Sequence, residues 1–260
     1  WGVRLERVVP RAVVLVGCWV NKHRGRSVGK SGAREKANPN NPGNVNSPSP
    51  PDEPGFSSMF NGTDLTGWDG QMNHWSVQDG AIVGQTTKLD PLQGKTYLIY
   101  TNGPIADFEL RFSYKIAHTG DKGFGNSGVE YRGKDFGNFQ VGGYQVDIDA
   151  GNNYSGILYE ELMDGILAQR GQKTVVKTVA GQTRIEVTGS VGDSNEIQNS
   201  IQKEGWNDCV IIANGNHFQH FINGRQTVDV TDGRTGRKGA RDGSTALRLH
   251  DDGTMHIPVH

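Results

Sequence analysis

The sequence predicts an all-β fold, a sandwich of two antiparallel sheets, and three observations carry this prediction. Glycine is frequent, with 37 residues among 260, and Gly, Asn or Asp stands at most boundaries between short β-rich segments. Apolar and polar side chains alternate within these segments, as they do in a strand with one buried face. Segments with helical periodicity are scarce. A dozen short strands without intervening helices indicate two packed sheets.

The expected strands follow one another from residue 60 to residue 250. They lie within residues 60–70, 74–85, 96–103, 107–117, 127–133, 142–151, 155–161, 165–171, 174–181, 184–189, 206–216, 217–230 and 245–250. The Asn-Gly pairs in "IANGN" and "INGRQ" predict hairpins, because this dipeptide accepts the positive φ angles of a type I′ turn. One short helix is expected, from Asn195 to Lys203, at an edge of the sandwich.

Residues 1–54 are predicted to lie outside the β-domain, which we expect over residues 55–260. Residues 1–17 resemble a leader, since a short apolar run follows three arginines and "LVGC" resembles a bacterial lipoprotein cleavage site. Residues 18–54 contain "NPNNPGNVNSPSPPDEP", which is too poor in apolar residues to fold and indicates a flexible linker. We therefore expect an exported protein, periplasmic or associated with the cell envelope, with Cys18 as the site of a lipid anchor.

The distribution of charge argues against nucleic acid as a partner. Residues 1–38 carry nine Lys or Arg and two Asp or Glu, which leaves residues 39–260 with a net charge of −8. An acidic domain lacks the basic surface that phosphate contacts require. The two cysteines, Cys18 and Cys209, do not form a disulfide framework, and Cys209 in "WNDCVIIA" is expected to be a buried, inert thiol.

Acidic side chains stand in the middle of an expected strand, "GGYQVDIDAG" (residues 142–151). Strand alternation places Tyr144 and two aliphatic residues on the face that meets the core. The opposite face presents Gln145, Asp147 and Asp149 in a row. A strand with only a structural role would more simply carry Thr, Ser or Lys there, so this face is a candidate site.

Other expected strands offer polar side chains in the same way. Alternation pairs Glu130 with Arg132 in "SGVEYRG" and Arg248 with His250 in "ALRLH", each pair opposite apolar neighbours. In "ILYEE" (residues 157–161) it leaves open which of the two acids joins this face. Two interpretations follow, a solvated face crossed by salt bridges or a polar groove for a sugar. Aromatic residues in nearby turns, Tyr154 among them, would suit the second interpretation.

The motifs resemble one bacterial family. The segments "FNGTDLTGW", "WSVQDGAIVG", "DFELRFSYKI", "GNSGVEYRG", "GGYQVDIDAG", "YSGILYEE", "EGWNDCVIIANGN", "HFINGRQTVDV" and "LRLH" follow one another as in the DUF1080 family, also named the 3-keto-disaccharide hydrolases. The resemblance covers roughly residues 56–250 and implies a concanavalin-like jelly roll. Two departures stand out: Met163 and Asp164 in "MDGILAQRG", and the ending "DDGTMHIPVH" in place of a final apolar strand. We therefore expect that strand to be missing or altered, which leaves an exposed edge and an uncertain placement of His250.

The resemblance implies cleavage of a glycoside whose sugar is oxidised at C3. Removal of the acidified C2 proton gives an enediolate, loss of the C1 substituent gives a 2-hydroxy-3-keto-glucal, and addition of water completes a net hydrolysis. Such chemistry needs a base, an acid and a group that stabilises the enediolate. The assignments that follow are catalytic roles for Glu130, Asp147, Glu160 and His250, and sugar binding for Arg132, Tyr144, Gln145, Asp149 and Tyr154.

The same resemblance implies no organic cofactor and no partner protein in the reaction, although a separate sugar 3-dehydrogenase must supply the substrate. Glu130, Asp147 and His250 are also the residue types that could bind Ca²⁺, Mg²⁺ or Mn²⁺. Two alternatives remain open. One is a lectin-like sugar-binding module. The other is a conventional laminarinase-like glycosidase, which is disfavoured because Gln145 stands where the nucleophilic Glu of such enzymes would be.

Overall fold

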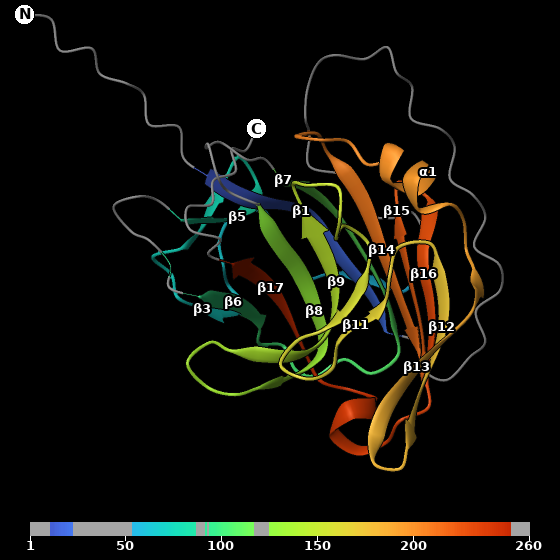
Figure 1. Cartoon of the computed structure of the whole chain (residues 1–260). Helices are drawn as coiled ribbons and strands as arrows, with labels where there is room; N and C mark the ends of the chain where they lie inside the picture. The colour runs from blue at the N-terminus through green and yellow to red at the C-terminus, as the bar shows by residue number, and fades with distance from the viewer. Residues whose placement is uncertain (1–10, 23–53, 87–91, 93, 117–124, 251–260) are drawn as a thin grey trace, which may run out of the picture.

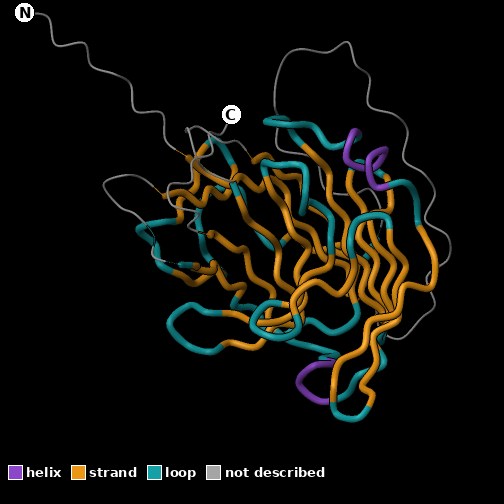
Figure 2. Tube along the Cα trace, viewed as in Figure 1, coloured by secondary structure: helices purple, strands orange, loops and turns teal. Residues whose placement is uncertain are grey.

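The computed structural model describes residues 11–22, 54–86, 92, 94–116 and 125–250. Within these residues the chain forms two β-sheets that pack face to face, with two short helical segments at the periphery (Figures 1 and 2). The predicted β-sandwich is therefore confirmed. No helix among the described residues is long and apolar enough to cross a membrane.

The large sheet has the strand order β13-β12-β16-β15-β14-β7-β1-β5-β4, with β2 paired to β1. Its strands are β1 (Arg11–Lys22), β2 (Phe56–Ser58), β4 (Trp75–Gln78), β5 (Ala81–Thr86), β7 (Phe108–Ile116), β12 (Gln172–Val179), β13 (Gln182–Ser190), β14 (Asn207–Asn214), β15 (His217–Ile222) and β16 (Arg225–Asp232). Strands β12 and β16 pair in parallel, unlike the antiparallel pairs predicted. In the chain they are separated by β13, β14 and β15, so the chain returns to β12 through a long crossover and not through a hairpin.

The small sheet has the order β11-β10-β9-β8-β17-β6-β3. Its strands are β3 (Trp68–Gly70), β6 (Lys95–Tyr100), β8 (Asn126–Asp135), β9 (Val141–Asp149), β10 (Leu158–Glu160), β11 (Gly165–Ala168) and β17 (Ser244–His250). The helix α1 (Ser194–Asn199) is shorter than predicted, and the Asp193 carboxylate caps it by accepting from two backbone N–H groups. A 3₁₀ turn, η1 (Gly236–Gly239), precedes β17.

Aromatic rings fill the space between the sheets. Tyr144 of β9 lies 4.4 Å from Phe218 of β15 and 5.7 Å from Tyr131 of β8, measured between ring centroids. Phe108 of β7 meets Tyr131 edge to face. Each such pair adds about 0.5–1.5 kcal/mol to the apolar burial. The inner face of the small sheet therefore packs in the core, and the acids lie on its outer face.

The β-sandwich includes a strand that precedes residue 55, where the sequence predicted the domain to start. Strand β1 lies inside the large sheet, paired antiparallel with β5 on one side and with β7 on the other. Its apolar run was interpreted as a leader, but the same run suits a strand in the middle of a sheet. Cys18 lies in this strand, is 5% exposed, and its thiol contacts the sulfur of Met59 at 3.7 Å. A lipid on that sulfur would require β1 to leave the sheet. The linker at 23–53 and the altered ending at 251–260 lie outside the described residues.

Candidate active site on the small sheet

The outer face of the small sheet gathers polar side chains from adjacent strands. Glu130 of β8 stands opposite Gln145 of β9, and Gly128 of β8 stands opposite both Asp147 of β9 and Arg248 of β17. Residues that are directly opposite share a face of the sheet. The alternation seen in the sequence has therefore placed an amide, two acids and a guanidinium side by side.

Gly128 has a geometric role in this arrangement. It lies between Arg248 and Asp147, whose strands are separated by β8, yet the Arg248 guanidinium lies 3.2 Å from the Asp147 carboxylate. A Cβ atom on Gly128 would meet the Gln145 side chain at 2.6 Å. The missing side chain thus leaves the space through which Arg248 and Gln145 reach Asp147.

Asp147 has two polar partners and little contact with solvent. The Gln145 amide donates to one of its carboxylate oxygens, and Arg248 Nη1 donates to the same oxygen and to Gln145 Oε1, each at 3.2 Å. Asp147 is 4% exposed and Arg248 is 5% exposed. A carboxylate held in this way has one fixed direction, set by the sheet and not by a mobile loop.

Glu161 and Lys95 form a second ion pair beside the first. Lys95 Nζ lies 2.7 Å from Glu161 Oε1, and Glu161 Oε2 lies 3.8 Å from Arg248 Nε. The Tyr97 ring stands next to Arg248, because the two residues are opposite each other in β6 and β17. We call these residues the Asp147 cluster, whose members are Lys95, Tyr97, Glu130, Gln145, Asp147, Glu161 and Arg248.

Burial changes the acidity of two carboxyl groups in the cluster. It raises the pKa of Asp147 to about 7, although Arg248 opposes this shift. Burial also raises the pKa of Glu130 well above its ordinary value, and the charge of Glu161 adds to the effect. Asp147 therefore titrates near neutral pH, and the surroundings of Glu130 favour its protonated form. Two carboxyl groups with different protonation states are the usual basis for an acid and a base in one site.

Several buried polar atoms of the cluster have no hydrogen-bond partner within the described residues. They are both carboxyl oxygens of Glu130, the Tyr97 hydroxyl and Nε of Arg248. Buried polar groups in folded proteins nearly always have a partner, and exceptions gather where a ligand or water binds. The orphaned atoms lie on neighbouring strands of one face, so they indicate where a polar ligand would bind.

Comparison with known families decides the identity of the chain. The model of a family described as the 3-keto-alpha-glucoside-1,2-lyase-like domain matches residues 55–257 of this chain. The chain belongs to this family. Its function is accordingly related to carbohydrates. No curated protein matches the sequence.

Solved structures with a similar fold share little sequence with this family member. A candidate glycosyl hydrolase from Parabacteroides distasonis has a TM-score of 0.48 and 18% identity, over 76% of this chain and 88% of its own. A second candidate glycosyl hydrolase from the same organism has a TM-score of 0.43 and 17% identity, over 71% and 86%. The carbohydrate-binding module CBM66 from Bacillus subtilis has a TM-score of 0.38 and 15% identity, over 71% and 88%.

Three predicted site residues of this 3-keto-glucoside lyase-like chain come together as expected: Glu130, Gln145 and Asp147. Asp149 shares their face, but one of its oxygens accepts hydrogen bonds from the backbone and hydroxyl of Ser155, so it shapes the loop after β9. Tyr154 lies in that loop and is 40% exposed. Its role in sugar binding stays a prediction.

His250 ends β17 two residues after Arg248 and stands opposite Lys95. Its proposed part in proton transfer also stays a prediction. Among the described residues, no three His, Cys, Asp or Glu side chains are grouped so that they could hold a metal ion. Glu130, Asp147 and His250 are not grouped in this way, and a divalent cation at this site stays a prediction. The positive charge next to Asp147 comes from Arg248.

Arg132 does not join the cluster, contrary to the prediction. A β-bulge follows Tyr131, and Arg132 has a φ of +50°. The bulge turns its guanidinium toward the core side, where it stacks over Phe218 and forms a 2.8 Å ion pair with Asp107. Tyr144 is also outside the cluster, because its hydroxyl points between the sheets and donates to Asp232 at 2.7 Å.

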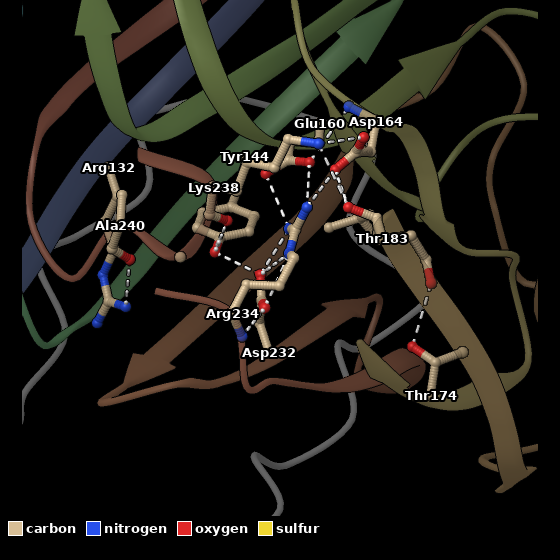
Figure 3. Close-up of polar contacts among 12 residues, drawn as sticks. Arg132, Tyr144, Glu160, Asp164, Thr174, Thr183, Asp232, Arg234, Lys238 and Ala240 are labelled. Carbon is tan, nitrogen blue, oxygen red and sulfur yellow. Dashed lines mark hydrogen bonds and ion pairs between the residues drawn. The ribbon is translucent and has the colours of Figure 1, made fainter. Parts of the chain in front are cut away.

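Glu160 is outside the cluster as well. It lies opposite Tyr144 and so faces the interior, where it binds the buried guanidinium of Arg234 at 2.9 Å (Figure 3). Asp232 and Asp164 bind the same guanidinium at 2.6 and 2.5 Å. This network joins β10, β16 and the 3₁₀ turn around the buried Arg234 guanidinium. A hollow of about 210 Å³ lies beside it, lined by Leu162, Met163, Asp164 and Lys238.

The sequence-based assignments missed four members of the cluster: Lys95, Tyr97, Glu161 and Arg248. The alternation of polar and apolar side chains had placed Arg248 on a polar strand face, but the sequence did not show which residues of other strands lie beside it. Glu161 was one of two acids that the pattern could not separate. Lys95 gave no signal, and Tyr97 was only one of several aromatic residues considered for sugar contacts, because nothing in the sequence shows that β6 pairs with β17.

Proposed function

We propose that the Asp147 cluster cleaves 3-keto-glycosides by removing the C2 proton of the oxidised sugar. Family membership supports the substrate class. The observation that carries the proposal is Asp147 itself, a buried carboxylate on a rigid strand with a pKa near 7 and a guanidinium 3.2 Å away. A general base works best when its pKa lies near the working pH.

In the first step, ionised Asp147 accepts the proton from C2, and the electron pair of that bond moves toward the C3 carbonyl. The negative charge that develops on the enediolate oxygens needs a fixed cation or donor close by. Arg248 serves this role in the proposal. Burial alone would lower the pKa of Arg248, but the negative charge of Asp147 raises it above its ordinary value, so the guanidinium stays charged.

In the second step, the enediolate re-forms the C3 ketone and expels the C1 substituent, which leaves a double bond between C1 and C2. The departing oxygen needs a proton. Glu130 can supply it, since burial raises the pKa of its carboxyl group and favours the protonated form. Addition of water to the double bond then returns a proton to C2 and gives the free 3-keto-sugar. No step in this proposal uses a metal ion.

A sugar-binding module would use the same orphaned donors and acceptors but would have no need for a base with a raised pKa. A conventional glycosidase would need a second ionised carboxylate as nucleophile, or as a base for water. Gln145 stands beside Asp147 in that position and cannot supply one. These differences allow one experiment to distinguish the three functions.

The experiment compares 3-keto-trehalose with trehalose under multiple turnover, with and without EDTA. We expect release of sugar and transient ultraviolet absorbance of the glucal from the oxidised substrate only, whether or not chelator is present. Asp147→Asn should lower the rate by about 10²–10⁴-fold. Asp208→Asn is the matched control, since Asp208 is exposed on the large sheet and bonds to Ser113.

Release of sugar from trehalose itself would contradict the proposal and favour a conventional glycosidase. Binding of 3-keto-trehalose without turnover would favour the binding module. The oxidised substrate must come from a separate enzyme that oxidises a glycoside at C3, and we propose that this dehydrogenase acts before the present protein. Export to the periplasm or envelope also remains a proposal, which fractionation of producing cells would test.

A further inference from the structure

The strand β13 forms an open edge of the large sheet. Within the described residues it has a neighbour on one side only, β12. Almost every residue of β13 is exposed, including Ile185 at 42% and Val187 at 56%. Figure 1 shows the β12–β13 hairpin projecting past the body of the sandwich. Long edge strands with exposed β-branched residues are templates for pairing with another strand.

The hairpin turn determines which backbone groups face outward. Ala180 and Gly181 both have positive φ angles, +50° and +77°, as in a two-residue type I′ turn. Val179 and Gln182 therefore close the turn as a hydrogen-bonded pair. Because such pairs alternate along an antiparallel ladder, the N–H and C=O groups of residues 183, 185 and 187 point away from β12.

These outward groups restrict how a second copy of the strand could pair. When a two-fold axis relates two copies, side chains from one face of the first sheet lie beside side chains from the same face of the second. Only registers that keep this match are allowed. The register centred on residue 184 would place Arg184 opposite itself, and the register centred on 186 would do the same with Glu186. Both bring like charges together.

The register centred on Ile185 has no such conflict. It places Arg184 of each copy opposite Glu186 of the other, which gives two opposite-charge pairs on one face. Ile185 then meets Ile185 of the second copy on the other face, and Thr183 meets Val187. The three outward-pointing positions of each strand all face outward-pointing positions of the other, so the hydrogen-bond ladder is continuous.

In a single copy, Arg184 lies next to another positive charge. Arg184 stands opposite Lys177 in the hairpin, and Lys177 already pairs with Glu186 at 2.7 Å. Glu186 of a second copy would offset the repulsion between the two cations.

We propose that β13 is a dimerisation edge, through which two copies of this chain join their large sheets into one continuous sheet by an antiparallel β13–β13 pair centred on Ile185. A single strand edge is a small interface, so the dimer forms reversibly and depends on protein concentration. This proposal does not depend on the function of the Asp147 cluster.

Sedimentation velocity of the full chain over a range of concentrations tests the dimer, and charge variants test its register. Arg184→Glu and Glu186→Arg each place like charges opposite in both pairs, and each should raise the dimer dissociation constant about tenfold or more. An equimolar mixture of the two variants should dimerise again, because each strand then faces its complement. The double variant carrying both changes should also dimerise.

A cross-linking pair gives an independent readout. Ile185→Cys should form a disulfide-linked dimer on mild oxidation, since opposite residues of a strand pair have Cα atoms within disulfide range. Gln182→Cys is the matched control, because Gln182 would lie opposite Thr188. All these positions are on the exposed hairpin, so circular dichroism should show an unchanged fold. A sedimentation coefficient of a monomer at every concentration, or a dimer that none of the charge variants weakens, would overturn the proposal.

Discussion

Replacing Asp147 by Asn removes a group whose ionisation the fold opposes. Burial raises the pKa of Asp147 from 3.8 to about 7. A carboxyl group with a higher pKa in the folded chain binds its proton more tightly there than in the unfolded chain. Its contribution therefore favours folding at low pH and is lost as the pH rises toward 7. Between pH 5 and pH 8 the loss amounts to about 3 kcal/mol, from about two pH units of extra proton binding by the folded state.

Urea unfolding at pH 5 and pH 8 measures this contribution. We expect the wild-type free energy of unfolding to fall between the two pH values by about 3 kcal/mol more than that of Asp147→Asn, since other groups titrate in both proteins. Asp208→Asn should follow the wild type. A difference below about 0.5 kcal/mol between wild type and Asp147→Asn would mean that Asp147 titrates like an ordinary surface acid. Asp147 would then not be a base whose pKa is tuned to neutral pH.

Three further predictions concern the framework around the cluster. Gly128→Ala should lower activity and cost about 1–3 kcal/mol of stability, because its Cβ would displace Gln145; unchanged kinetics would contradict the role given to Gly128. Arg234→Met should cost about 3–5 kcal/mol in urea unfolding, because it leaves buried carboxylates without a cation; a loss below about 1 kcal/mol would refute this. Removal of residues 1–22 should abolish the cooperative thermal transition, since it opens β5 and β7; a truncated protein with the wild-type transition would show that β1 is dispensable.

Strand periodicity predicted the part of the site that depends on regular strands. Glu130, Gln145 and Asp147 share a face because β8 and β9 are regular at these positions, with side chains that alternate by two. The same rule failed for Arg132, since one bulge after Tyr131 reverses the side on which the next residue lies. A bulge is a property of the strand pair, and a single sequence does not reveal it.

Other errors came from segments whose composition suits two structures. An apolar run of about ten residues serves equally as the centre of a leader or as a buried strand, and only the pairing of β1 with β5 and β7 separates the two. Glu160 and Glu161 are adjacent, so one must face the interior. The choice depends on the register of β10 against β9, which brings Glu160 opposite Tyr144. The sequence predicted the fold class and the central acids, whereas pairing and register determined the remaining members of the site.

The central claim is that Asp147 removes the C2 proton of a 3-keto-glycoside. Proton NMR of 3-keto-trehalose incubated with the protein in D₂O follows that proton directly. We predict that the C2 proton is absent from the 3-keto-sugar released by the wild-type protein, whereas the unoxidised glucose keeps its own, and that with Asp147→Asn the C2 signal of the oxidised unit persists for at least about 100-fold longer. Release of a 3-keto-sugar that keeps its C2 proton, or equal loss of the signal with Asp147→Asn and wild type, would contradict this claim.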